Sequence, residues 1–363
     1  MQDDFEEAGS IMKLNIAIGN RKVGLGNPVW IIAELSANHN QDFDQAVQLI
    51  KAAKEAGADA VKIQTYTPDT MTIDCDNEYF RIGKGTIWEG RTLYDLYKEA
   101  FTPWDWQPKL KEIANDLGMD LFSSPFDMSA VDFLEKMDVP AYKIASFELV
   151  DIPLIQHVAK TGKPIIMSTG MATLAEIDEA VTAAREAGCK EITLLKCTSA
   201  YPADPAVMNL RTIPHMAEAF GVPAGLSDHT LGIAVPVAAV ALGACIVEKH
   251  FTLSRGIPGP DSTFSLEPHE FKAMVDAIRI TEKSLGKISY EVTKYETASR
   301  IFRRSLFVVK DMKAGELFTE DNVRIIRPGH GLHPRYFAKI VGKKITNSAA
   351  KGAPVSWDLI CNS

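Results

Sequence analysis

Short apolar runs alternate with amphipathic stretches over most of the chain, from Val29 to about Leu285. The runs are rich in β-branched residues, which is typical of buried strands, and the stretches between them repeat apolar positions with a helical period. Several of these stretches, such as 43–56 and 174–187, end in a glycine just before the next run, as helices commonly do. The pattern predicts eight strands, at 29–34, 60–64, 120–123, 141–145, 164–168, 192–197, 223–227 and 244–250.

Two α/β folds share this alternation, the (β/α)8 TIM barrel and the doubly wound open sheet. Polar residues follow nearly every predicted strand, at the end where a barrel builds its active site, so we predict the barrel. A long insertion after the second strand, at 66–108, carries Trp88, Trp104 and Trp106. We expect this insertion to cover the mouth of the barrel.

The pattern changes after Gly286, which indicates further domains. Residues 287–303 are polar without a clear apolar face, as in a linker, and 304–363 contain short β-like runs with turn signals and a weak internal repeat of 315–321 at 352–358. At about 60 residues this last part has a small core, which favours docking on something larger. We predict a TIM-barrel domain and a small β-rich domain, with boundaries at 1–28 for an N-terminal extension and β-hairpin, 29–286 for the barrel, 287–303 for the linker and 304–363 for the β-rich domain.

Composition excludes several classes of function. The 39 Lys and Arg against 47 Asp and Glu give a net charge of −8, which argues against a nucleic-acid partner and against binding to an anionic membrane. The five cysteines form no close pairs, so neither a disulfide framework nor a cysteine metal site is expected. No apolar run approaches the roughly 20 residues of a membrane span, and the acidic start is unlike a signal peptide. We expect a cytoplasmic protein that meets any anionic substrate in a local basic pocket.

Two predicted strands lead into histidines. His229 follows the run at 223–227, and His250 ends the run at 244–250, with room between them for a helix that joins parallel strands. Both imidazoles then face the same mouth. Either histidine alone is more typical of a hydrogen-bonded core residue, but the matched pair favours a divalent metal that keeps open positions for water or substrate.

Lysines also lie near the ends of predicted strands. Lys62 and Gln64 share a parity on the second strand, and Glu34 ends the first. An inward lysine is costly without an anion, which leaves two interpretations, a salt bridge to Glu34 or an anionic substrate. Lys143 is likewise a lysine near the end of a predicted strand. Lys196 adds a third cation, but its parity leaves open whether its side chain points into the barrel.

Hydroxyl side chains are dense at the same strand ends. Singly, each is more typical of a helix N-cap, but a ring of them beside lysines favours a phosphorylated or polycarboxylate substrate. The chain has no P-loop and no dinucleotide fingerprint, which argues against nucleotide and hydride chemistry. The hydroxyl residues are Ser123, Ser124, Ser146, Ser168, Thr169, Thr198, Ser199 and Ser227.

Ordered motifs along almost the whole chain resemble the sialic acid synthase family, the phosphoenolpyruvate-condensing enzymes that make nonulosonic acids. Residues 327–329 resemble the arginine-bearing loop of the antifreeze-like domain in the same proteins. The resemblance therefore implies a TIM barrel followed by an antifreeze-like domain. The matching barrel stretches are 32–34, 38–39, 60–65, 142–146, 168–171, 197–198, 201–202, 226–230, 248–252 and 259–261.

Within the family, residues 65–69, 146–148 and 331–334 resemble the members that make pseudaminic acid, while Lys196 and Ser199 differ from sialic acid synthases. This implies a metal-dependent condensation of phosphoenolpyruvate with 2,4-diacetamido-2,4,6-trideoxy-L-altrose to give pseudaminic acid and phosphate. Synthesis of N-acetylneuraminic or legionaminic acid from another N-acylated hexose is the alternative within the family. A sugar- or ice-binding protein without catalysis is the alternative outside it.

The resemblance also implies roles for individual residues. His229 and His250 would bind Mn²⁺, Mg²⁺ or Co²⁺, and Glu34 would handle a proton. With Lys62 these are the candidate catalytic residues. The substrate-binding candidates are Lys62 for the phosphoenolpyruvate carboxylate, Lys143, Ser146, Ser168 and Ser227 for its phosphate, Gln64, Tyr201 and Asp261 for the sugar, Ser123 and Ser199 in the hydroxyl ring, and Arg327 for an acetamido group.

Arg327 would reach its site from the tail of a neighbouring subunit. The resemblance therefore implies a domain-swapped homodimer whose other partners are small molecules, namely phosphoenolpyruvate and an N-acylated amino sugar.

Overall fold

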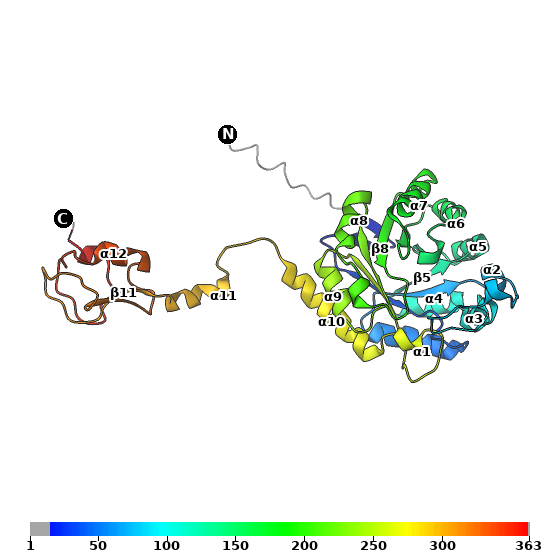
Figure 1. Cartoon of the computed structure of the whole chain (residues 1–363), viewed down its shortest axis with the longest axis horizontal. Helices are drawn as coiled ribbons and strands as arrows, with labels where there is room; N and C mark the ends of the chain where they lie inside the picture. Colours follow the sequence, from blue (N-terminus) through cyan, green and yellow to red (C-terminus); the bar gives the residue numbers. More distant parts are fainter. Residues whose placement is uncertain (1–14, 362–363) are drawn as a thin grey trace. The chain divides into compact units, whose positions relative to one another are not determined.

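The computed structural model describes residues 15–361, and the predicted N-terminal extension before Asn15 lies outside them (Figure 1). The chain divides into two compact units, one ending at Gly286 and the other beginning at Lys287. Each unit has its own hydrophobic core, and we describe each by itself.

Eight parallel strands close into a barrel in the first unit, as predicted. The open-sheet alternative is wrong, because the last strand pairs with the first, placing His250 beside Glu34. Glu34 in turn pairs with Lys62 on the next strand. The strands in barrel order are β3 (Trp30–Glu34), β4 (Ala60–Thr65), β5 (Asp120–Pro125), β6 (Tyr142–Ile144), β7 (Ile165–Ser168), β8 (Ile192–Cys197), β9 (Ala224–Asp228) and β10 (Ile246–His250).

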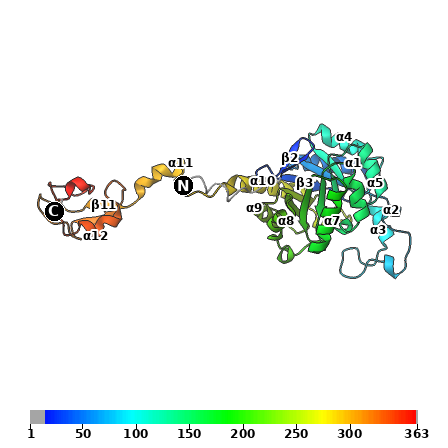
Figure 2. The ribbon, with the colours of Figure 1, turned by 90° about the horizontal axis from the view of Figure 1, so that it is seen from above.

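Helices surround the strands in both views (Figure 1, Figure 2). Local signals explain their limits: the Asp42 carboxylate caps the first helix, and Gly57, with a φ of 91°, turns the chain into β4. Thr173 and Glu176 form a capping box. The helices are α1 (Phe43–Glu55), α4 (Gln107–Asp116), α5 (Met128–Lys136), α6 (Ile152–Ala159), α7 (Leu174–Glu186), α8 (Thr212–Phe220), α9 (Ala234–Ala241) and α10 (Pro268–Leu285).

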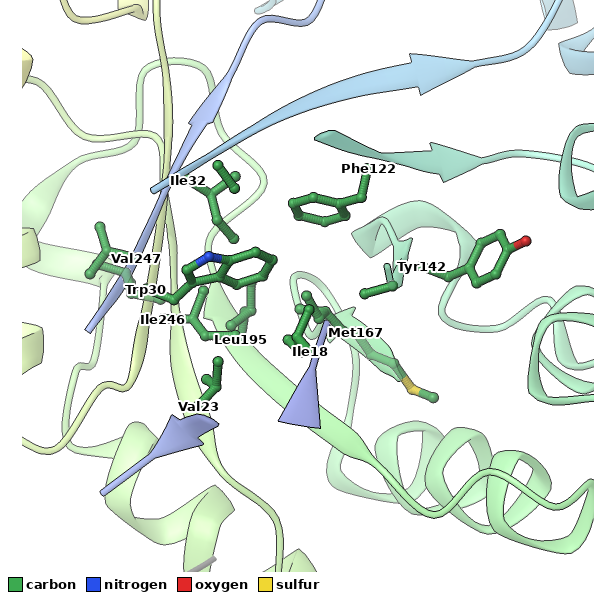
Figure 3. Packing of buried hydrophobic residues seen from close by; sticks show 14 of the residues in the cluster. Ile18, Val23, Trp30, Ile32, Phe122, Tyr142, Met167, Leu195, Ile246 and Val247 are labelled. Carbon is green, nitrogen blue, oxygen red and sulfur yellow. The ribbon is translucent and has the colours of Figure 1, made fainter. Parts of the chain in front are cut away.

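A hairpin of β1 (Asn15–Ile18) and β2 (Arg21–Gly24) lies against the barrel interior. Figure 3 shows Ile18 and Val23 from this hairpin beside Trp30, and all three are fully buried. Trp30 stacks on Phe122, with ring centroids 5.2 Å apart. Side chains therefore fill the barrel at the end where its strands begin, and the opposite end is left for chemistry.

The second unit is small and β-rich, as predicted. Its sheet pairs β11 (Ser305–Val308) with β12 (Val323–Ile326), and isolated bridges such as Ile345 to Ile360 extend the pairing. Phe318 and Val355, the apolar positions of the sequence repeat, are both fully buried in its core. The unit also contains α11 (Lys294–Thr297), within the predicted linker, and α12 (Phe337–Ile340).

Across residues 15–361, no helix is both long and apolar enough to cross a membrane.

Candidate active site

The two histidines meet at the mouth of the barrel. Their ring centroids are 5.3 Å apart, and His229 and His250 are 5% and 9% exposed. The Nδ1 atom of His229 lies 3.0 Å from the carbonyl oxygen of Thr198, which suits a tautomer with Nδ1–H donating and Nε2 free to bind a metal. Burial lowers the pKa of His250 well below its ordinary value, which favours the neutral imidazole.

These histidines fit a metal that keeps open positions. The buried Nδ1 atom of His250 has no hydrogen-bond partner among the described residues, so it is free to serve as a ligand. Within residues 15–361 no group of three or more His, Cys, Asp and Glu side chains forms a metal cluster. Two protein ligands, with water or substrate as the others, are what this geometry allows.

A buried cluster of two lysines and two glutamates lies beside the histidines. Lys62 Nζ is 2.7 Å from Glu34 Oε2 and 3.5 Å from Glu248 Oε1. Lys143 Nζ is 3.6 Å from the same Glu248 oxygen. The salt bridge between Lys62 and Glu34 that we considered from the sequence is therefore present. This salt bridge does not exclude an anionic substrate, because Lys62 and Lys143 share a single carboxylate as their second partner, that of Glu248.

The two glutamates in the cluster differ in their acidity. Burial, together with the neighbouring charge of Glu248, raises the pKa of Glu34, although Lys62 opposes this. Burial acts in the same direction on Glu248, but Lys143 and Lys62 outweigh it and lower the pKa of that carboxyl. Environments that separate two carboxyl groups in this way assign them different roles. The directions of these shifts make Glu248 the stronger acid of the two.

Hydroxyl groups complete the ring around the lysines. Lys143 Nζ donates to Ser168 Oγ at 2.7 Å, and Ser227 Oγ donates to Glu248 Oε1 at 3.3 Å. The amide of Gly170 donates to Ser146 Oγ at 3.2 Å. A Cβ atom at Gly170 would lie 2.3 Å from Ser199 Oγ, so Ser146 and Ser199 both crowd this glycine.

Ser123 does not belong to this ring, which corrects our prediction. Its hydroxyl lies 2.6 Å from Thr65 Oγ1, on the face of the strand away from the barrel interior. The neighbouring Ser124 accepts from Lys62 Nζ at 3.2 Å instead. Phe122 points inward onto Trp30, so by alternation Ser124 does too and Ser123 does not.

Polar side chains continue from the cluster to the outer mouth. Gln64 Nε2 donates to Glu34 Oε1 and to Ser36 Oγ, each at 2.9 Å, and Ser36 donates to Asp261. Asp261, Gln64 and Tyr201 line one pocket together with His250. The Tyr201 ring lies 4.3 Å from the His229 ring between centroids. The residues predicted to contact the sugar are therefore adjacent to the histidine pair.

The insertion after β4 covers this mouth in part, through Trp88. Its Nε1 atom donates to the carbonyl of Pro260 at 3.0 Å, and its ring lies 5.6 Å from Tyr201. The other two tryptophans pack against helices instead, Trp104 on Phe133 and Trp106 on Phe43.

Several site features were missed or left open at the sequence level. Glu248 was not recognised, although its parity with His250 on β10 is a usable signal. Glu148, whose pKa burial raises to about 7, lies in the 146–148 motif but was given no role. Lys196 turns away from the cluster and donates to the carbonyl of Cys197 at 2.7 Å. Arg327 follows β12 in the second unit and has an exposed side chain.

Comparison with known proteins agrees with this geometry. Residues 49–290 match the NeuB family, and residues 303–360 match the SAF domain. The chain is 46% identical to the pseudaminic acid synthase of Helicobacter pylori over 91% of this chain and 97% of that protein. It is 48% identical to the pseudaminic acid synthase of Campylobacter jejuni serotype O:23/36, over 89% and 94%.

A solved structure shares the architecture. The spore coat polysaccharide biosynthesis protein SpsE of Bacillus subtilis matches with a TM-score of 0.66 and 35% identity, over 96% of this chain and 99% of that chain. A barrel with paired histidines and lysines at its mouth, an SAF domain and this level of identity lead to one conclusion: the chain belongs to the NeuB family.

Proposed function

We propose that the protein condenses phosphoenolpyruvate with 2,4-diacetamido-2,4,6-trideoxy-L-altrose to give pseudaminic acid and phosphate. The observation that carries this is the position of two buried lysines beside two buried histidines in one mouth. Lysines supply charge for an anion, and histidines supply ligands for a metal at the adjacent aldehyde. The pseudaminic acid synthases at 46% and 48% identity support this choice of sugar.

Phosphoenolpyruvate binds at the lysine cluster in this proposal. Lys62 holds its carboxylate, and Lys143, with Ser146, Ser168 and Ser227, holds its phosphate. Ser124 joins Lys62 in place of Ser123. Binding of the substrate replaces the lysines' contacts to Glu34 and Glu248 with contacts to phosphate and carboxylate.

His229 and His250 would hold the divalent metal, and their free nitrogens and burial fit that role. A metal held there would polarise the aldehyde oxygen and orient water. Mn²⁺, Mg²⁺ and Co²⁺ are the candidates that the family resemblance implies, with water and substrate supplying the remaining ligands.

The reaction balances with the residues in place. C3 of phosphoenolpyruvate attacks the aldehyde carbon, the aldehyde oxygen gains a proton, water adds at C2, and phosphate leaves with the bridging oxygen. Glu34, with its raised pKa and its contact to Lys62, is the group that exchanges the proton. Holding both substrates side by side supplies much of the remaining rate.

The sugar lies beside Gln64, Tyr201 and Asp261, which line the pocket that includes His250. Arg327 reaches an acetamido group of the sugar from a second copy of the chain. Ser199 lies beside Ser146 at the same mouth of the barrel.

A domain-swapped homodimer accounts for exposed apolar side chains after the barrel. Ile288, Tyr290 and Tyr295 are 93%, 99% and 81% exposed in the single chain. Such side chains gain stability when a second copy covers them. The proposed location of the enzyme is the cytoplasm, where phosphoenolpyruvate and reduced cysteines are available.

Phosphate release tests the function and its alternatives together. The purified protein is incubated with phosphoenolpyruvate, Mn²⁺ and one sugar at a time. We expect release with the 2,4-diacetamido-2,4,6-trideoxy-altrose and much less with N-acetylmannosamine or the legionaminic acid precursor. Release with one of the latter two instead would change the sugar, and no sugar-dependent release would support the non-catalytic alternative.

A further inference from the structure

The pocket at the barrel mouth has an apolar side that the proposed reaction does not use. Besides Ser36, Gln64 and Asp261, large apolar and aromatic side chains line the same pocket. We call these residues the apolar wall: Tyr66, Met71, Leu96, Tyr97 and Phe126.

Most of the apolar wall belongs to the insertion after β4. Met71 ends α2 (Pro68–Met71), whose start is fixed by a capping box at Thr67, and Leu96 and Tyr97 lie on α3 (Leu93–Ala100). The Tyr66 ring packs edge-on against Tyr97 and Phe126, with centroids 5.7 Å and 5.2 Å away. Interlocked rings of this kind hold the shape of the wall before any ligand arrives.

The apolar wall also carries one polar group, the hydroxyl of Tyr66. Tyr66 is 2% exposed, and its backbone carbonyl accepts from Trp104 Nε1 at 3.0 Å. Tyr66 lines the pocket, and its hydroxyl, which bonds to no described residue, keeps some accessible surface and is not among the fully buried unpartnered atoms. A phenol in such surroundings usually finds a partner, so a ligand atom in the pocket is the natural candidate.

An N-acetyl group matches both features of the wall. Its methyl group fits against apolar side chains, and its amide offers a donor and an acceptor. A bare methyl group would make no use of the Tyr66 hydroxyl, and a sugar hydroxyl would make no use of Leu96 and Phe126.

We propose that the apolar wall binds the N-acetyl group on C4 of the sugar, with the methyl against Leu96 and Phe126 and the amide bonded to the Tyr66 hydroxyl. This inference rests on the proposed function, which supplies the sugar. The aldehyde carbon has to lie at His229 and His250, so a substituent on C2 stays beside the strand ends. Substituents farther along the sugar reach the insertion, which makes the wall a determinant of specificity at C4.

The test compares sugars that differ at one carbon. Steady-state kinetics at saturating phosphoenolpyruvate and Mn²⁺ are measured with the diacetamido sugar, with its analogue bearing a hydroxyl at C4, and with its analogue bearing a hydroxyl at C6. The variants are Tyr66→Phe, which removes only the hydroxyl, and Leu96→Asn, which keeps the side-chain size. Tyr79→Phe and Ile73→Asn, exposed by 81% and 59% on the same insertion, are matched controls.

We expect each wall variant to reduce the preference for acetamido over hydroxyl at C4 by about tenfold or more in kcat/KM. The KM for phosphoenolpyruvate, the preference at C6 and both control variants should not change. Circular dichroism checks that each variant is folded, and Tyr66→Phe alone decides the test if Leu96→Asn unfolds.

Three results would overturn the inference. Equal losses on the C4 acetamido and C4 hydroxyl sugars would mean that the wall only supports the fold of the mouth. A changed preference at C6 instead of C4 would mean that the wall holds the methyl of the deoxy carbon. If the unmodified enzyme releases no phosphate with the diacetamido sugar, the proposed function fails together with this inference, whereas the first two results leave the function standing.

Discussion

At the scale of single residues, the site is a set of buried charges that compensate one another. Lys62 and Lys143 face Glu34 and Glu248, two lysines against two carboxyl groups, in a region where each residue is at most 5% exposed. Such a cluster is costly to bury unless every charge has a partner. In the proposed reaction an arriving anion exchanges partners with the glutamates, so the cluster would be prepared for phosphoenolpyruvate before it binds.

The histidine pair predicts metal dependence. His250→Ala should bind Mn²⁺ much more weakly by isothermal titration calorimetry and lose at least about a hundredfold in kcat, because the metal contributes several kcal/mol to the transition state. His269→Ala, whose side chain is 76% exposed on α10, is the control and should match the unmodified protein. Full activity of the unmodified protein in excess chelator would contradict the metal site.

Lys143 predicts a separate effect on one substrate. Lys143→Met keeps the chain length and removes the charge that contacts Ser168 and Glu248. The Kd for phosphoenolpyruvate should rise about ten- to a hundredfold, as expected for a lost charge-assisted contact, while sugar binding changes little. Lys272→Met, on the exposed side of α10, serves as the control. An unchanged Kd would show that Lys143 does not hold the phosphate.

At the scale of elements, the strand ends and their connecting loops place the chemistry. Eight strands and most helices were predictable, because buried apolar runs and helix-ending glycines are local signals. Which residues of each strand point into the barrel was less predictable. In β5, Leu121 and Phe122 are both apolar because a barrel strand is buried on both faces, so nothing in the sequence distinguishes Ser123 from Ser124.

Contacts between distant segments were also beyond the sequence. The three tryptophans of the insertion give the same signal in the sequence. Among them, within the described residues, only Trp88 lies at the mouth, where it bonds to Pro260. Glu248 is inward because it shares its parity with His250, but its partners Lys62 and Lys143 come from strands far away in the chain. Only the closed barrel brings these side chains together.

The loop after β7 gives a prediction at this scale. Gly170→Ala should raise the KM for phosphoenolpyruvate severalfold or more, because the new Cβ would lie 2.3 Å from Ser199 Oγ and 2.7 Å from Ser146 Oγ. The melting temperature should change little even though phosphoenolpyruvate binding weakens, since the side chains that must move belong to the site. Gly83→Ala, where a Cβ meets nothing within 4 Å, should leave both unchanged. An unaltered KM in Gly170→Ala would remove Ser146 from the phosphate site.

At the scale of the whole molecule, the proposed dimer lets a second copy of the chain complete each site. Ile288 and Tyr290 follow directly after the barrel and are almost fully exposed. The small core of the second unit favours docking on a larger surface. A second copy of the chain supplies one in the proposed dimer, with Arg327 as the residue it contributes.

Subunit complementation tests that arrangement. A Lys62→Ala chain and an Arg327→Ala chain are unfolded and refolded together, because a stable dimer does not exchange readily. Random pairing should then recover about a quarter of the activity, from heterodimers with one intact site. Each variant refolded alone is the control and should stay inactive. Heterodimers confirmed by mass but without activity would mean that Arg327 serves its own barrel or no site.

The central claim is a condensation in which water enters at C2 and phosphate leaves with the bridging oxygen. Phosphoenolpyruvate labelled with ¹⁸O at that oxygen is turned over with Mn²⁺ and the 2,4-diacetamido-2,4,6-trideoxy-altrose, and both products are weighed by mass spectrometry. The account predicts one nonulosonic acid without label for each labelled phosphate. Label retained in the sugar acid, or phosphate released without a new carbon–carbon bond, would contradict it.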